Sequence, residues 1–230
     1  MHDRAGDHVS LEVVPKGALG VGLGHHGDAV PRHLHQQMVE LVPVDGRAPS
    51  VATGVKRARP DALVLTIQGD GDMVNEGLQE VLHTAARGEN VTCVMLNNGV
   101  FGETGGHMTS TTLLGQRTKT SLEGRTPEAH GRPILLATLL AQLDGAAYVA
   151  RGAVNSAGNV ARTKKMLLQA LRTQEAGAGF SFVEILTMCP TGWFIETQDA
   201  PEYLAENLAA VHTGGVLKDV VSTNDPNERQ

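Results

Sequence analysis

The chain has 230 residues, a formal net charge of −6 at pH 7 and two cysteines. This length allows one domain with a substantial core, and the acidic balance offers no electrostatic footprint for nucleic acid. No apolar run reaches the length of a membrane span, and no signal-peptide pattern opens the chain. Two cysteines imply no disulfide framework. We therefore expect a cytoplasmic protein that binds neither nucleic acid nor a membrane.

Strand-like and helix-like patterns alternate along the chain. The alternation predicts an α/β fold, a mainly parallel sheet flanked by helices, in a single domain over residues 1–230 with flexible ends at 1–10 and 220–230. Asn159 is expected to cap a helix. In chain order we expect a strand at 11–14, a strand at 38–42, a helix at 48–57, a strand at 62–68, a helix at 76–87, a strand at 91–96, a helix at 133–143, a strand at 147–150, a helix at 159–175, a strand at 180–186 and a helix at 201–211.

Two polar turns follow two consecutive apolar strands of this pattern. Gly69-Asp70-Gly71-Asp72 follows the strand at 62–68, and Asn98 follows the strand at 91–96. Each turn alone is common in proteins that bind nothing there. Together they lie where open α/β sheets bind ligands, beyond the carboxyl ends of the strands. A carboxylate and an amide oxygen suit Mg²⁺, and glycines let the backbone approach a phosphate. The pattern predicts a magnesium–diphosphate site.

A long segment rich in Gly and Thr, residues 99–132, comes directly after the second turn. Loops longer than about 15 residues in compact domains are usually functional or disordered. Because this one adjoins the predicted site, we favour a functional loop.

These residues resemble a known family. The Gly-Asp-Gly and Asn-Asn turns look like the signature of thiamine-diphosphate enzymes. Three longer runs narrow the resemblance to the β subunits of 2-oxoacid:ferredoxin oxidoreductases of the 2-oxoisovalerate or 2-oxoglutarate type: DGRAPSVATG at 45–54, NNGVFGETGGH with TSTT at 97–112, and MCPTGW at 188–193. The likeness extends from about residue 42 to about residue 219. It implies the diphosphate-type domain of a thiamine-diphosphate enzyme.

The resemblance also implies roles for individual residues. Asp70, Asn98 and the carbonyl of Val100 would bind Mg²⁺, and amides of Gly71 and Asp72 would face the diphosphate near a helix start. The remaining residues expected to contact the cofactor lie beside the thiazolium or at the cofactor edge; they are Asp45, Gly46, Arg47, Gly69, Thr104, Gly105 and Gly106. Asp45 departs from the His-Gly-Arg common in the family. Glu103 departs from an apolar residue, and is either a substrate neighbour or a solvated loop carboxylate.

The implied activity is the oxidative decarboxylation of a 2-oxoacid to an acyl-CoA and CO₂, with electrons passing to ferredoxin. In the family, the glutamate that activates the cofactor lies in another subunit, so no catalytic residue is assigned in this chain. The resemblance therefore implies an α subunit that completes the site, with γ and ferredoxin-like δ subunits as further partners, and a 2-oxoacid and coenzyme A as substrates.

The cysteine pattern departs from the family. The usual cysteine-rich opening is absent, Leu23 stands where a cysteine is expected, and only Cys189 matches a cluster ligand. A [4Fe–4S] cluster needs four thiolates, so we expect none in this chain, and we expect Cys93 to be a core thiol. His25 and His26 are expected to be ordinary loop residues. Two alternatives stay open: a non-redox thiamine-diphosphate decarboxylase subunit and a non-catalytic structural subunit.

Overall fold

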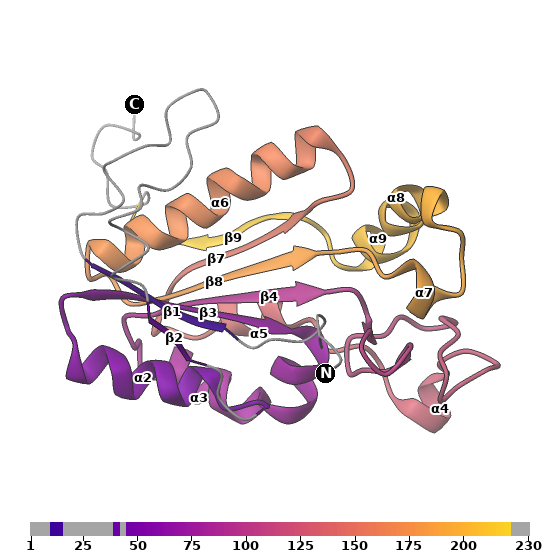
Figure 1. Cartoon of the computed structure of the whole chain (residues 1–230), viewed down its shortest axis with the longest axis horizontal. Helices are drawn as coiled ribbons and strands as arrows, with labels where there is room; N and C mark the ends of the chain where they lie inside the picture. The colour runs from indigo at the N-terminus through magenta and orange to yellow at the C-terminus, as the bar shows by residue number, and fades with distance from the viewer. Residues whose placement is uncertain (1–9, 16–38, 42–44, 222–230) are drawn as a thin grey trace, which may run out of the picture.

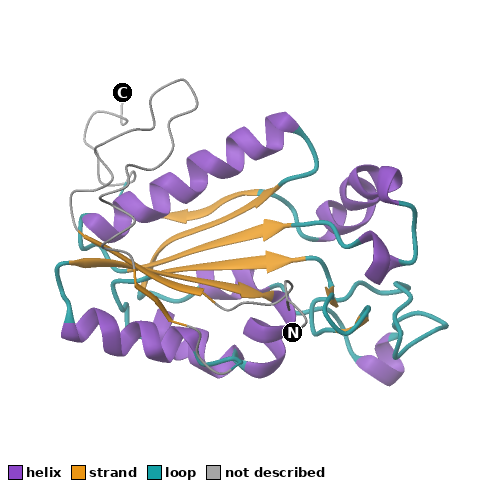
Figure 2. Cartoon of the chain, viewed as in Figure 1, coloured by secondary structure: helices purple, strands orange, loops and turns teal. Residues whose placement is uncertain are grey.

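The computed structural model describes residues 10–15, 39–41 and 45–221, and it contains a seven-stranded sheet with the order β2-β1-β3-β4-β8-β7-β9 (Figures 1 and 2). The predictions for Leu23, His25 and His26 lie outside the described residues. Strands β3, β4, β8 and β7 are parallel to one another. Strand β1 pairs antiparallel with both β3 and the edge strand β2, and the other edge strand, β9, pairs antiparallel with β7. The strands are β1 (Ser10–Pro15), β2 (Val39–Leu41), β3 (Ala62–Gly69), β4 (Thr92–Asn97), β7 (Ala146–Ala153), β8 (Phe180–Leu186) and β9 (Gly215–Asp219).

Helices cover both faces of the sheet, as Figure 1 shows. Helices α2 (Ala48–Ala58), α3 (Leu78–Ala86) and α5 (Leu136–Ala141) pack on one face, where the largest core cluster joins Val81, Leu140 and Phe182. The long helix α6 (Ala157–Glu175) packs on the other face, where Ala170 meets Tyr148 and Val183. The predicted α/β fold, mainly parallel and flanked by helices, is confirmed. Within the described residues, no helix is both long and apolar enough to cross a bilayer.

Short elements gather beyond the carboxyl ends of the parallel strands. Some of them contribute to a third core cluster that includes Val100, Leu186 and Trp193. These elements are the two-stranded pair β5 (Val100–Phe101) and β6 (His107–Met108), the π-helical turn η2 (Gly71–Glu76), α4 (Pro127–His130), α7 (Pro190–Trp193), η3 (Thr197–Asp199), α8 (Ala200–Tyr203), η4 (Leu204–Leu208) and α9 (Ala209–Val211). This end of the sheet therefore carries most of the irregular structure.

Some predicted boundaries were wrong. Ser156, not Asn159, caps α6, because its hydroxyl accepts a hydrogen bond from the backbone N–H of Asn159. The helix predicted at 76–87 is α3, two residues shorter at its start, with the unpredicted turn η2 before it. The helix predicted at 133–143 begins only at Leu136. Strand β9 was not predicted at all. Cys93 is fully buried in β4, and burial raises the pKa of its thiol to about 12, so the predicted core thiol is confirmed.

Arg125 organises the long segment from residue 99 to residue 132. Its side chain is only 5% exposed. Its guanidinium donates six hydrogen bonds of 2.7–3.2 Å, to the backbone carbonyls of Thr109, Ser110, Thr112, His130, Gly131 and Arg132. No carboxylate of the described chain pairs with it. Carbonyl dipoles thus replace the water that a buried cation loses, and these bonds tie the stretch 109–112 of the loop to the stretch 130–132.

A buried ionic network connects the ends of β4, β7 and β8. Glu184 is fully buried; its Oε2 accepts from Arg151 Nε at 2.7 Å and its Oε1 from Asn97 Nδ2 at 2.7 Å. Nδ1 of the buried His212 lies 3.3 Å from Glu184 Oε1. Burial by itself would raise the pKa of Glu184, but His212, Arg151 and Asn97 outweigh it and lower the pKa to about 2. The network holds Asn97 at the strand end that precedes Asn98.

Replacement of Arg125 tests whether it holds the loop together. Arg125→Met keeps the aliphatic bulk and removes every donor. We expect the free energy of unfolding to fall by about 3 kcal/mol or more, because buried carbonyls lose a charged donor. Urea denaturation of the purified chain measures it. Arg117→Met is the matched control, because exposed Arg117 lies in the same loop and donates to the carbonyl of Leu122 at 2.9 Å; its effect should stay within about 0.5 kcal/mol. Equal losses would contradict this role.

The Glu184 network predicts a pH-dependent stability. The folded-state pKa of Glu184 is about 2 and its ordinary value is 4.5, so its contribution is fully present above about pH 4.5 and is lost as the pH falls toward 2. Glu184→Gln should therefore lower the free energy of unfolding by about 3–5 kcal/mol at pH 7. The difference from wild type should shrink below about pH 4.5.

Urea denaturation across this pH range checks the prediction. Asp61→Asn is the control, because Asp61 pairs with Arg59 at 3.7 Å with both side chains exposed; it should cost less than about 1 kcal/mol. A Glu184→Gln loss that does not vary with pH would show that the network does not set this carboxyl's ionisation.

Candidate functional site

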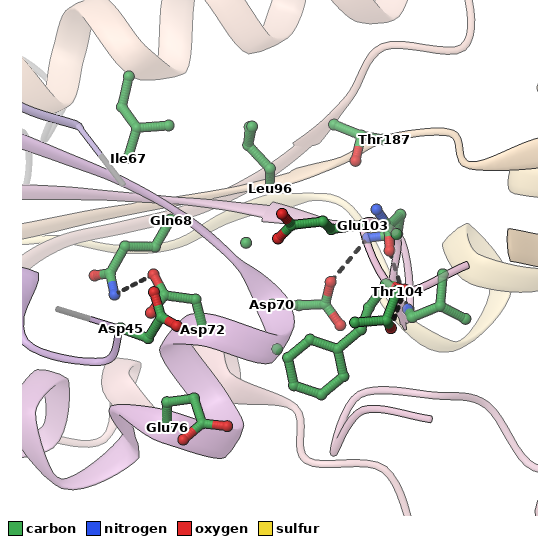
Figure 3. A pocket seen from close by; sticks show the side chains of 16 residues that line it. Asp45, Ile67, Gln68, Asp70, Asp72, Glu76, Leu96, Glu103, Thr104 and Thr187 are labelled. Atoms are coloured by element: carbon green, nitrogen blue, oxygen red, sulfur yellow. Dashed lines mark hydrogen bonds between the residues drawn. The ribbon is translucent and has the colours of Figure 1, made fainter. Parts of the chain in front are cut away.

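A cavity of about 370 Å³ lies beyond the carboxyl ends of β3, β4 and β8 (Figure 3). Each of these parallel strands ends one residue before a lining residue: Asp70 after β3, Asn98 after β4 and Thr187 after β8. The sequence predicted this convergence for the first two. The full lining is Asp45, Ile67, Gln68, Gly69, Asp70, Gly71, Asp72, Glu76, Leu96, Asn98, Val100, Phe101, Gly102, Glu103, Thr104 and Thr187.

Asp70 is the deepest carboxylate of this cavity, with 1% of its surface exposed. Its Oδ2 accepts hydrogen bonds from the hydroxyls of Thr109, at 2.7 Å, and Thr111. Its Oδ1 lies 3.4 Å from the backbone N of Asn98. Burial raises the pKa of Asp70 to about 6, although these hydrogen bonds oppose the shift. The group therefore gains most from a cation beside Oδ1, the less satisfied oxygen.

The turn after β4 presents further oxygen atoms. Asn98 Oδ1 accepts from the backbone N of Val100 at 3.0 Å, and the carbonyl of Asn98 accepts from Trp193 Nε1 at 2.7 Å. The neighbouring Asn97 has a structural role, since its Oδ1 accepts from the N of Gly99 at 3.0 Å. Carboxylate, amide and carbonyl oxygens from Asp70 and this turn are the donor types that a hard divalent cation prefers.

Asp72 lies on the wall of the same cavity, in the first turn of η2. Gln68 Nε2 donates to its Oδ2 at 2.8 Å, and the backbone N of Gly46 donates to its Oδ1. Burial, with Asp45 and Glu76 nearby, raises its pKa. Gly71 and Asp72 open the π-helical turn η2, which precedes the predicted helix; π-helical turns are often found at functional sites. The ring of Phe101 packs closely on Gly71, where a Cβ would lie 2.2 Å from Phe101 Cε1, so any larger residue would have to displace the ring.

Four predicted site residues do not line the cavity. Gly46, at φ +76°, supports it from behind, because a Cβ there would lie 2.5 Å from the backbone carbonyl of Glu76. Arg47 points to the surface and pairs with Glu80 at 2.6 Å. Gly105 and Gly106 form the tight turn between β5 and β6, where the carbonyl of Gly106 accepts from the N of Lys119 at 2.7 Å.

The remaining predicted residues, Asp45, Gly69, Gly71, Asp72, Val100 and Thr104, do line the cavity with Asp70 and Asn98. Sequence reasoning missed the direct contacts of Thr109 and Thr111 with Asp70, although their TSTT segment formed part of the resemblance. It also missed Gln68 and Glu76. Gln68 could have been suspected, because it is a polar residue that ends an apolar strand just before the Gly-Asp-Gly turn.

The cavity is strongly acidic. Five carboxylates line it, from Asp45, Asp70, Asp72, Glu76 and Glu103, and its described lining contains no Lys, Arg or His. Within the described residues, the cavity included, no three His, Cys, Asp or Glu side chains gather as a metal site by themselves. Cys189 packs against the cluster around Trp193. An anionic ligand therefore needs a cation to enter this cavity.

Comparison with known proteins identifies a family whose matched residues include most of the cavity lining. The family described as thiamine pyrophosphate enzyme, C-terminal TPP binding domain, matches residues 22–185, which include β3, β4, the turns after them and most of β8. The match covers the predicted residues that line the cavity, so the Gly-Asp-Gly and Asn-Asn turns belong to a domain that binds thiamine diphosphate.

Two curated proteins are similar in sequence to most of the chain. The ketoisovalerate oxidoreductase subunit VorA of Methanothermobacter thermautotrophicus is 39% identical over 163 residues, 71% of this chain and 34% of the relative. The 2-oxoglutarate synthase subunit KorB of Archaeoglobus fulgidus is 38% identical over 163 residues, 71% of this chain and 57% of the relative. The aligned part of the chain thus spans between a third and three fifths of these relatives.

A solved structure agrees with this family. The 2-oxoglutarate:ferredoxin oxidoreductase of Magnetococcus marinus, determined with 2-oxoglutarate, coenzyme A and succinyl-CoA bound, superposes with a TM-score of 0.61 at 27% identity, over 76% of this chain and 62% of that one. The chain therefore belongs to the thiamine pyrophosphate enzymes, whose C-terminal TPP-binding domain it carries, and its relatives are subunits of 2-oxoacid oxidoreductases.

Proposed function

We propose that the chain is the cofactor-binding subunit of a 2-oxoacid:ferredoxin oxidoreductase, which converts a 2-oxoacid to an acyl-CoA and CO₂. The observation that carries the proposal is the buried Asp70 carboxylate, which faces the Asn98 turn across an acidic cavity in a TPP-binding domain. The names of the curated relatives and of the solved structure support the reaction class.

The donor set fits a magnesium ion that carries the cofactor diphosphate. Asp70 would supply a carboxylate oxygen, Asn98 its side-chain oxygen and Val100 its carbonyl, leaving positions for phosphate oxygens and water. Thr109 and Thr111 would keep the Asp70 carboxylate oriented, since their hydroxyls already bond one of its oxygens. When bound, thiamine diphosphate supplies the nucleophilic carbon that decarboxylation of a 2-oxoacid requires.

Electrostatics makes the cation essential to this proposal. A diphosphate brings negative charge toward a cavity whose described lining has five carboxylates and no basic side chain. Two anions brought together at low dielectric repel strongly. Thiamine diphosphate is therefore expected to enter as a magnesium complex, with the metal against Asp70.

The proposed complex needs partner chains. No catalytic acid or base is assigned among the residues that line the cavity, and the resemblance places the activating glutamate in an α subunit. We propose that such a subunit covers the open side of the cavity, that γ and ferredoxin-like δ subunits complete the assembly, and that coenzyme A is the acyl acceptor.

A second candidate function follows from the cysteines. The whole chain has two, and one of them, Cys93, is buried in β4. The printed sequence does not supply the four thiolates that a [4Fe–4S] cluster needs. The second candidate is a thiamine-diphosphate decarboxylase that releases an aldehyde without transferring electrons.

Turnover by the complex that co-purifies with the chain distinguishes these functions. The complex is supplied with thiamine diphosphate, Mg²⁺, coenzyme A and single 2-oxoacids, and the reduction of a viologen dye is followed. Dye reduction that requires both coenzyme A and a 2-oxoacid is the expected result. CO₂ and aldehyde without dye reduction would favour the second candidate. If neither dye reduction nor CO₂ release is seen, the chain is a non-catalytic subunit.

Replacement of Asp70 tests the metal assignment without any turnover. Asp70→Asn keeps the size of the side chain and removes its charge, so we expect magnesium-dependent binding of thiamine diphosphate to weaken by about 100-fold or more. The chain has one tryptophan, and its Nε1 bonds the carbonyl of Asn98. Quenching of Trp193 fluorescence in the assembled complex therefore offers a binding signal beside calorimetry.

Asp144→Asn serves as the control, because Asp144 is exposed in the connection between α5 and β7. Its affinity for the cofactor should equal that of wild type. Undiminished binding by Asp70→Asn would mean that the metal ligands lie elsewhere.

A further inference from the structure

The acidic lining bears on which 2-oxoacid can enter. We propose that the cavity selects 2-oxoacids whose side chains carry no negative charge, and that Glu103 is the specificity-determining residue. This inference rests on the proposed function, because it concerns the substrate of the same cavity. The relatives include subunits named for ketoisovalerate and for 2-oxoglutarate, so the family alone does not decide between an uncharged and an acidic substrate.

Glu103 is placed to meet a ligand. It lies in the turn between β5 and β6, beside Thr104, and Figure 3 shows its side chain reaching into the cavity between Leu96 and Asp70. It forms no ion pair or hydrogen bond within the described residues. The nearby ammonium group of Lys119 donates to the carbonyl of Thr104 at 3.0 Å instead. No cationic or hydrogen-bonding group of the described residues therefore stands against the Glu103 carboxylate.

The other carboxylates of the cavity differ from Glu103. Asp70 is bonded by two threonine hydroxyls, and Asp72 by Gln68 and the backbone of Gly46. A magnesium ion would neutralise the Asp70 end together with the cofactor diphosphate. Asp45 and Glu76 lie on the far side of Asp72, in the view of Figure 3. Glu103 is therefore the carboxylate on the Asn98 side of the cavity whose charge nothing in the described chain offsets.

A 2-oxoacid with an acidic side chain has two carboxylates that the Glu103 carboxylate repels. Every 2-oxoacid brings the carboxylate that decarboxylation removes, but 2-oxoglutarate brings a second one on its side chain. That extra charge would approach a cavity with no basic residue in its described lining, where like charges repel. An uncharged branched side chain has no such cost, and it could contact apolar groups of the lining at Ile67, Leu96 and Phe101.

The test compares two substrates in the co-purified complex, loaded with Mg²⁺ and thiamine diphosphate. For wild type we expect kcat/KM for 2-oxoisovalerate to exceed that for 2-oxoglutarate by about tenfold or more. Glu103→Gln should shift the ratio toward 2-oxoglutarate by about fivefold or more, and Glu103→Lys should shift it further. Calorimetric binding of each acid without coenzyme A gives the same comparison independently of turnover.

Glu123→Gln is the matched control, because Glu123 is an exposed carboxylate of the same long loop that does not line the cavity; its ratio should equal that of wild type. A wild-type preference for 2-oxoglutarate, or a ratio that Glu103→Gln leaves unchanged, would overturn the inference while the proposed function stands. Failure to bind or consume any 2-oxoacid would overturn both.

Discussion

The hydrogen bonds of Arg125 are the constraint on which the candidate site depends. One buried cation bonds six carbonyls from two separate stretches of a long loop, 109–112 and 130–132, and that loop carries the two threonines that bond Asp70. A loop rich in Gly and Thr has little apolar surface to bury, so charged hydrogen bonds must supply much of its order. Arg125 does not line the cavity, but it orders the loop whose threonines hold the Asp70 carboxylate in position.

A second set of buried charges fixes the other half of the site. Glu184, held by Arg151, keeps Asn97 at the end of β4, and Asn97 in turn bonds the amide of Gly99. The two halves meet at Asp70 and Asn98, where burial without a counter-charge leaves the pKa of Asp70 near 6. Hydrogen bonds from the protein thus hold Asp70 and Asn98 in place before any ligand binds, which is a form of preorganisation for a metal-bound ligand.

The sequence predicted the polar residues at the strand ends well, but it did not predict the residues and pairings that hold them in place. Asp70 and Asn98 were predictable because each polar residue follows an apolar strand, a pattern that is local. Arg125 was not, since a lone arginine in a polar loop looks like a solvated one until its carbonyl partners are known. Ser156 and Asn159 are both good capping residues three positions apart, so local pattern could not choose between them. Strand β9 is a half-buried edge strand that depends on distant pairing with β7.

The position of the metal in the assembled complex tests the central claim most directly. Crystals of the complex with thiamine diphosphate, and with Mn²⁺ in place of Mg²⁺, would locate the ion by anomalous scattering. The account predicts a metal in direct contact with oxygens of Asp70, Asn98 and Val100 and with the cofactor diphosphate. A metal bound outside this set, or a cofactor bound without contact to Asp70, would contradict it.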